Sequence, residues 1–206
     1  MGFHWLGIAS GVVGAAVLAG PTGVVAQRHE EPRIVIRLEH GTPREQLAKA
    51  TLEAVLASVS PVRYTFTHEI VIAGGAINHA FPVLTLNVLF AESGDDLLST
   101  FVHEQLHWYL RDHDAQQRAA VADLRRIYPV VPVGLPKGAD SEYSTYGHLV
   151  DCYLELEADR QLLGPDRALA VVRRKPWYTW IYSTVLSDER TIAAVVDRHR
   201  LRVPER

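Results

Sequence analysis

Residues 100–110 of the chain read TFVHEQLHWYL and contain the pattern His-Glu-x-x-His. Residues four apart in an α-helix lie on the same face, so the imidazoles of His103 and His107 can reach one metal ion. Glu104 then lies beside the pair, where its carboxylate can take a proton from a water that the metal activates, without being a ligand itself. The spacing therefore predicts a helix that carries a metal-dependent hydrolytic site.

The residues around this motif indicate that the helix is buried. Apolar side chains occupy most of the remaining positions from 101 to 110, and Glu104 is the only carboxylate or cationic side chain among them. A solvated helix would carry charged residues between such positions. Buried ionisable groups are normally paired or bound to a metal, so metal binding is favoured over a core helix with two hydrogen-bonded histidines.

Residues 100–110 resemble the active-site helix of the zincin metallopeptidases, which carries His-Glu-x-x-His among uncharged residues. The resemblance covers this helix closely, and the preceding strand and a later helix more loosely. It implies an α+β fold with a small sheet, an edge strand over the metal cleft, and Zn²⁺ as the cofactor. It also implies that a peptide or protein substrate binds in extended form by adding to the edge strand, residues 83–89.

The third metal ligand has two candidates, because a catalytic zinc needs three protein ligands and an open position. His113 has the spacing of the metzincin branch, H-E-x-x-H-x-x-G-x-x-H, but Leu110 stands where that motif turns at glycine. A continuous helix carries His113 about 9 Å along the axis from His107, out of reach of the same ion. The only methionine is Met1, so no Met-turn is present either. We therefore expect His113 not to be a ligand.

The favoured candidate lies in a helix predicted over residues 144–163. Five polar side chains fall along one stripe of this helix: His148, Asp151, Cys152, Glu155 and Asp159. In the gluzincin (thermolysin-like) branch, the third ligand is a Glu on a later helix, and an Asp four residues on binds a ligand histidine. The resemblance therefore assigns Glu155 to the metal and Asp159 to orienting His103 or His107, although Leu154 replaces the usual Asn. The alternative is that both carboxylates are solvated surface charges.

Other residues of the same helix have weaker assignments. His148 lies two turns before Glu155, where it can donate to the oxyanion of a tetrahedral intermediate, as Tyr143 or Tyr146 also can. Glu157 points away from the stripe and is expected to face solvent. Cys152, the only cysteine, is expected to be an inert thiol, and it excludes an internal disulfide framework and cysteine-based zinc sites.

Length and composition favour one globular domain. The chain has 206 residues, of which 48% are hydrophobic and 22% charged, as in ordinary globular proteins. A net charge of −3 gives no electrostatic basis for binding nucleic acid.

Residues 1–26 differ from the rest and are predicted to be a signal peptide. Leu6 to Leu18 is apolar, the first charged residue is Arg28, and small residues precede a cleavage site after Ala26. A membrane anchor is the alternative, but the apolar run is shorter than the ~20 residues that a span needs. We expect a secreted or extracytoplasmic domain over residues 27–206 with no stable membrane span.

Local patterns predict the remaining elements. Thr42 and Glu45 form a capping box with Pro43 between them, which predicts the start of a helix. Ser93 is a predicted N-cap for the motif helix, which should run to about residue 111. Strands are predicted over 33–38, 64–73 and 83–89, further helices over 115–127 and from 187 onward, and a loop over 129–138. The aromatic segment 177–182 is expected to pack in the core, with Tyr178 and Tyr182 as candidate pocket residues.

Taken together, the sequence predicts a zinc-dependent peptidase. His103, His107 and Glu155 would hold Zn²⁺, Glu104 would act as the general base, and His148 would assist at the oxyanion. A zinc-stabilised binding or structural protein is one alternative, and a metal-dependent hydrolase of a non-peptide amide is another. The presence of Glu104 favours an enzyme, because purely structural zinc sites are usually closed by four protein ligands.

Overall fold

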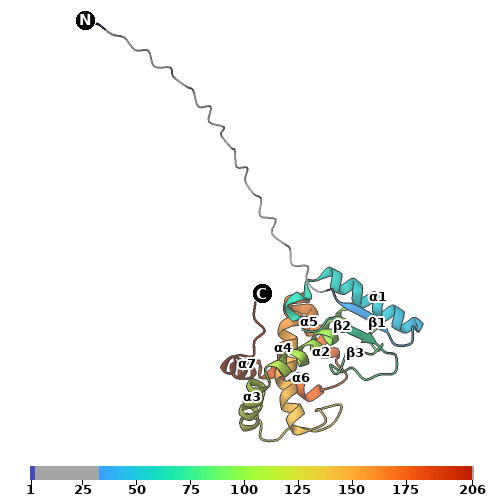
Figure 1. Cartoon of the computed structure of the whole chain (residues 1–206). Helices are drawn as coiled ribbons and strands as arrows, with labels where there is room; N and C mark the ends of the chain where they lie inside the picture. Colours follow the sequence, from blue (N-terminus) through green and yellow to red (C-terminus); the bar gives the residue numbers. More distant parts are fainter. Residues whose placement is uncertain (3–32, 206) are drawn as a thin grey trace. The chain divides into compact units, whose positions relative to one another are not determined.

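The computed structural model describes residues 1–2 and 33–205 (Figure 1). Residues 33–205 lie in one compact unit that combines a small sheet with α-helices, which is compatible with the predicted α+β class. Apart from Met1 and Gly2, the predicted signal peptide lies outside the described residues, as does its cleavage site. Within the described part of the chain, no helix is long and apolar enough to cross a membrane.

The sheet has three parallel strands in the order β1-β2-β3. They span Val35–Leu38, Glu69–Ile72 and Leu84–Leu86, and α1 (Pro43–Ser58) and the short 3₁₀ helix η1 (Pro61–Tyr64) connect the first two. Ile36, Ile70 and Leu84 stand in register and are buried on the inner face, whereas Arg37 and Glu69 form an exposed ion pair. Helices α1 and α2 pack on each other and on the strands, so both cover the inner face.

The capping box at the start of α1 is present as predicted. The Thr42 hydroxyl accepts from the Glu45 N–H, and the Glu45 carboxylate accepts from the Thr42 N–H. The same carboxylate also accepts from the N–H groups of His40 and Gly74, which follow β1 and β2. Burial alone would raise the pKa of Glu45, but these hydrogen bonds outweigh it and lower the pKa to about 2. Glu45 therefore joins two strand ends to the helix.

Helix α2, Gly94–Asp112, carries the motif and lies in the middle of the structure (Figure 1). Ser93 is its N-cap, as predicted, and every residue from Asp96 to Leu106 is buried. It packs against α1 and β3 on one side and against α4 (Glu142–Leu163) on the other. The burial agrees with the apolar surroundings of the motif in the sequence.

Helix α4 is the second central element. It packs against the motif helix and against the remaining helices, which are α3 (Asp114–Ile127), α5 (Pro165–Arg174), α6 (Thr179–Ser187) and α7 (Glu189–Arg198). Fourteen of the fifteen residues from Thr145 to Asp159 are buried, and Glu157 is the exception. A helix that is surrounded in this way brings both its polar stripe and its apolar side into the interior.

One prediction of secondary structure was wrong, and two helices were not predicted. Residues 64–68 were expected to begin a strand, but η1 ends at Tyr64 and β2 begins only at Glu69. The Gln105 side chain accepts from the N–H groups of Phe66 and Thr67 and donates to the Thr67 carbonyl, so it replaces a neighbouring strand. Helices α5 and α6 were not predicted as separate elements; Gly164, with a φ of 86°, and Pro165 separate α5 from α4.

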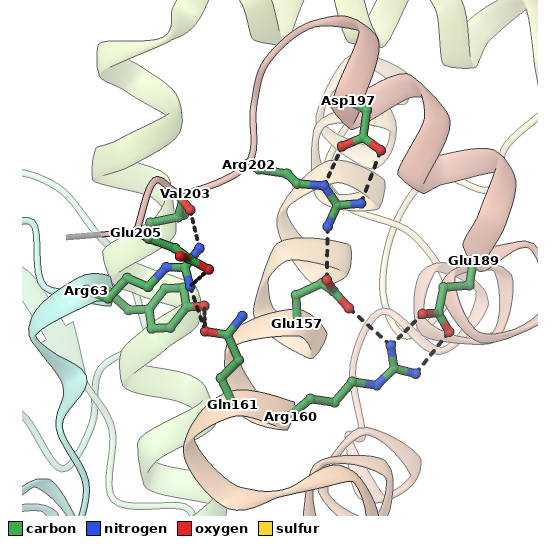
Figure 2. Close-up of polar contacts among 10 residues, drawn as sticks. Arg63, Glu157, Arg160, Gln161, Glu189, Asp197, Arg202, Val203 and Glu205 are labelled. Carbon is green, nitrogen blue, oxygen red and sulfur yellow. Dashed lines mark hydrogen bonds and ion pairs between the residues drawn. The ribbon is translucent and has the colours of Figure 1, made fainter.

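Ion pairs attach the C-terminal helix and the chain end to α4 (Figure 2). The Arg202 guanidinium binds Asp197 and Glu157, and Arg160 binds Glu157 and Glu189. Glu157 thus belongs to this partly exposed network, in agreement with its predicted position away from the polar stripe of α4.

Candidate metal centre

Four side chains from α2 and α4 converge on one point. They are His103 and His107 from the motif and His148 and Asp151 from α4, and one ligand atom from each lies within 4.8 Å of the others. Nε2 of His107 is 3.1 Å, and Nε2 of His103 is 3.6 Å, from Oδ2 of Asp151. Spacings of four residues on α2 and three on α4 place each pair on one helix face. This geometry is that of a candidate metal centre.

Hydrogen bonds orient two of the three imidazoles. Nδ1 of His148 lies 2.8 Å from the Ser144 carbonyl, which can only accept, so Nδ1 carries the proton. Nδ1 of His103 lies 3.0 Å from Oε2 of Glu155, and an ionised carboxylate likewise only accepts. In the neutral rings, both Nε2 atoms then have a free lone pair, which is the arrangement that a metal ligand needs.

Asp151 supplies the strongest indication that a cation fits here. Its side chain is 1% exposed, and neither carboxylate oxygen has a hydrogen-bond partner among the described residues. Burial raises the pKa of Asp151 to about 6, against the opposing influence of His103 and His148. A buried carboxylate without hydrogen bonds is costly, and coordination to a metal is one way to satisfy it.

The pKa values of the three histidines match this interpretation. Burial, reinforced by the charge of His103, lowers the pKa of His107 to about 3 and that of His148 to about 4, so both are neutral ligands at pH 7. Burial would also lower the pKa of His103, but the carboxylates of Asp151 and Glu155 outweigh it and hold the pKa well above its usual range. A metal cation in place of that proton would satisfy the same carboxylates.

Glu155, the predicted third ligand, lies on the other side of His103. Its Oε2 contacts Nδ1 of His103, on the ring edge away from Asp151, and accepts from the Tyr182 hydroxyl at 2.7 Å. A second group of potential ligands, His103, Cys152 and Glu155, does meet there, but it does not include His107. The structure therefore does not bring the predicted set together, and His148 and Asp151 stand beside the motif histidines instead.

Asp159 does not orient a motif histidine as predicted. It is fully buried one turn beyond Glu155 and makes no hydrogen bond to His103 or His107 within the described residues. Burial, followed by the charge of Glu155, raises its pKa to about 8. The carboxylate that orients His103 is that of Glu155. The predicted role thus belongs to the residue one helical turn before Asp159.

Glu104 faces a pocket of about 850 Å³ that opens over the histidines. Its side chain is nearly buried, and no described residue donates a hydrogen bond to it. Burial raises its pKa to about 7, while the charge of His103 acts in the opposite direction. A carboxylate with this pKa at a pocket floor suits a general base at neutral pH.

The edge of the sheet above this pocket differs from the prediction. Strand β3 was expected to be the free edge, but the N–H and carbonyl of Thr85 pair with those of His79 in an antiparallel bridge. Residues 77–80 are therefore outermost. The N–H groups of Asn78 and Ala80 make no hydrogen bond to the described residues, and both residues line the pocket. Any extended ligand would meet this segment rather than β3.

The other candidate residues lie outside the candidate metal centre. His113 ends α2 with its Nδ1 2.8 Å from the Tyr109 carbonyl and belongs to neither group of potential ligands, as expected. Tyr146 is buried and donates to the Tyr128 carbonyl, and neither it nor the exposed Tyr143 lines the pocket.

Three further side chains lie close to the histidines. Tyr178 lines the pocket with its ring centroid 4.5 Å from that of His148, and Tyr182 also lines it, although its hydroxyl is bound to Glu155. Cys152 is buried, which raises its pKa to about 11 and agrees with an inert thiol. Sequence reasoning missed Lys175, a buried pocket residue 2.8 Å from Glu155, because nothing near it in the chain marks it.

No protein-family model matches this chain, and no curated protein or solved structure is significantly similar to it. The geometry of the candidate metal centre and the resemblance of residues 100–110 are therefore the basis on which a function can be proposed.

Proposed function

We propose that the chain is a zinc-dependent hydrolase in which His103, His107 and His148 hold the metal and Asp151 lies within reach of it. The observation that carries the proposal is the convergence of three imidazoles on a buried carboxylate without hydrogen bonds. A set dominated by imidazole nitrogens with one carboxylate suits Zn²⁺ better than Mg²⁺ or Ca²⁺, which prefer oxygen ligands.

The pocket gives this centre a hydrolytic role. When bound, zinc would acidify a water molecule and polarise a carbonyl group. Glu104 would take a proton from the attacking water and give it to the leaving amine, since its carboxylate faces the pocket and is not engaged by the protein. Glu155 would hold His103 in the orientation that turns Nε2 toward the centre.

A peptide is the substrate that we propose for this pocket. The unpaired N–H groups of Asn78 and Ala80 run along its wall and offer hydrogen bonds to an extended backbone. Apolar side chains such as Phe81, Leu89 and Trp177 line the remaining wall and are partly exposed. They suit a peptide with large apolar side chains, which would cover them on binding.

A structural metal site is the second candidate, and one observation favours it. If Asp151 joins the three histidines as a ligand, the site has four protein ligands, as structural zinc sites usually have. The distance of 3.1 Å between Asp151 and His107 permits this. Against it stand the pocket over the site and the unengaged carboxylate of Glu104.

Metal analysis combined with a peptide-cleavage assay tests the proposal. We expect about one zinc per chain in the wild type, in Glu104→Gln and in the control His113→Ala. His107→Ala and His148→Ala should lose the metal. Glu104→Gln should keep the metal but lose cleavage by about 10²–10⁴-fold, the usual contribution of a general base.

Each contrary result has a definite meaning. Zinc retained in His148→Ala but lost in Glu155→Ala would restore Glu155 as the third ligand. Stoichiometric zinc with no cleavage of a mixed peptide library by the wild type would favour the structural site. Absence of zinc from the wild type after purification without chelators, and after addition of zinc, would overturn the proposal.

A further inference from the structure

We propose that Lys175 is a positioning residue of the metal centre, which acts on His103 through Glu155. The inference rests on the proposed function, because it assigns a role toward the same metal. Nζ of Lys175 lies 2.8 Å from Oε1 of Glu155, and the two side chains are 9% and 0% exposed. Buried lysines are rare unless they are paired, so this contact is a specific feature of the site.

The Glu155 carboxylate is held on every side. Oε1 accepts from the Ser99 hydroxyl at 2.7 Å and faces Lys175, while Oε2 accepts from the Tyr182 hydroxyl and faces Nδ1 of His103. A carboxylate has about four lone-pair sites, so these contacts leave it no freedom to rotate. Its orientation, and with it the orientation of the His103 ring, depends on all of its partners.

Among these partners, Lys175 is the one cationic side chain that belongs to neither group of potential metal ligands. A buried carboxylate that loses its cationic partner is strongly unfavourable and tends to move toward water or another cation. A bound metal would be another cation for Glu155, which would reach it by leaving Nδ1 of His103. Lys175 therefore keeps Glu155 behind His103 and out of the group formed with His107.

The position of Lys175 in the chain ties this contact to the pocket. It directly follows α5, and residues 176–178 after it line the pocket wall. Tyr178 at the end of this segment has a φ of 57°, an unusual backbone conformation for a tyrosine, and packs on His148. A plain structural ion pair between α5 and α4 would also explain the contact, so the test must separate the two roles.

Binding of Co²⁺, with its visible absorption spectrum, provides that test. We would titrate the wild type, Lys175→Met, Glu155→Gln and the double variant with Co²⁺ in competition with a chelator. Loss of a partner behind a metal ligand typically costs about 10–100-fold in metal affinity. We expect a loss of about tenfold and a shifted spectrum in Lys175→Met, and a loss in the double variant no larger than in Glu155→Gln alone.

The outcomes distinguish the inference from the proposed function. Wild-type affinity and spectrum in Lys175→Met, or losses that add in the double variant, would overturn the role of Lys175 and leave the metal site intact. Failure of the wild type to bind Co²⁺ or Zn²⁺ would overturn the proposed function itself. Lys137→Met, at an exposed lysine that does not line the pocket, is the matched control and should bind Co²⁺ like the wild type.

A second variant keeps the inference testable if Lys175→Met does not fold. Tyr182→Phe removes one hydrogen bond from the same carboxylate and preserves the ring. We expect it to weaken Co²⁺ binding severalfold and to shift the spectrum in the same direction. Unchanged Co²⁺ affinity and an unchanged spectrum in Tyr182→Phe would show that the orientation of the Glu155 carboxylate does not affect the metal. That result would overturn the inference.

Discussion

Oδ2 of Asp151 lies 3.1 Å from Nε2 of His107, and this contact joins the motif helix α2 to α4 at the candidate metal centre. Neither oxygen of Asp151 has a hydrogen-bond partner in the described residues, and the polar contacts of Oδ2 are ion pairs with His107 and His103. Coordination to a metal would give this buried carboxylate a partner in addition to the two histidines.

Asp151→Asn should therefore reduce the stabilisation that zinc provides. The substitution keeps the size of the side chain and removes its charge, so we expect the metal-free protein to unfold at the same temperature or higher. The rise in melting temperature on adding zinc should be smaller than in the wild type, because zinc affinity falls. Thermal unfolding with EDTA and with zinc measures both effects.

Asp123→Asn is the control for this prediction. Asp123 is also a buried carboxylate, but Arg198 and His199 bind it. Its replacement should lower the melting temperature equally with and without zinc. An unchanged zinc-induced rise in Asp151→Asn would contradict a role for Asp151 at the metal.

Gln105→Leu should destabilise the protein without removing its metal. Gln105 stands between the two motif histidines in the sequence, and its side chain is fully buried. Its amide makes three hydrogen bonds to the backbone of residues 66 and 67. We expect the free energy of unfolding to fall by about 2–3 kcal/mol, as measured by urea denaturation. Zinc content should stay at the wild-type level.

Gln116→Leu, at an exposed position on α3, should change the stability by less than about 0.5 kcal/mol. Equal stability of the two glutamine variants would mean that the 66–67 backbone finds other partners.

Glu45→Gln should weaken the fold in a pH-dependent manner. The pKa of Glu45 in the folded protein is about 2, below its ordinary value of 4.5. A carboxylate whose pKa is lowered in the folded protein contributes its full stabilisation at pH values above its ordinary pKa. This contribution to the free energy of unfolding is lost as the pH falls toward the pKa of the folded protein. The urea midpoint of Glu45→Gln should therefore lie below that of the wild type at pH 7, and the difference should shrink between pH 4.5 and pH 2.

Glu53→Gln, at a solvent-exposed site on the same helix, is the control and should follow the wild type throughout. A difference between Glu45→Gln and the wild type that stays constant with pH would show that the Glu45 charge does not stabilise the junction of α1 with the strand ends.

Trp177→Ala should weaken substrate binding more than catalysis. Trp177 is 46% exposed on the pocket wall and touches no group of the metal centre by hydrogen bond or ion pair. With a peptide substrate that carries apolar side chains, we expect KM to rise about tenfold, which corresponds to a loss of about 1.4 kcal/mol of binding free energy. The kcat should change little, because Trp177 would contact the substrate away from the reacting bond. Tyr143→Ala, exposed away from the pocket, should leave both constants unchanged.

Several features of this protein follow from residues that are close together in the chain. The Thr42–Glu45 capping box and the Ser93 N-cap depend on hydrogen bonds over three residues, so the sequence alone predicts the starts of α1 and α2. The shared face of His103 and His107 follows from the helical period. Such features need no knowledge of the tertiary structure.

Features that depend on distant partners were predicted less well. The segment before β2 has the composition of a strand, but the side chain of Gln105 binds its backbone. The edge of the sheet was assigned to β3, but His79 pairs with it across a turn that the sequence pattern does not reveal. In both cases, a specific partner outweighed a local preference.

The sequence by itself determined the His-Glu-x-x-His motif, its helix and the polar stripe on α4, because these are periodic and local. The sequence could not determine which turn of that stripe faces His107. His148 and Glu155 lie on the same side of α4, about 10 Å apart along its axis, and a shift by two turns exchanges them. Only the packing of α4 against α2 decided that His148 and Asp151 meet the motif histidines while Glu155 stands behind His103.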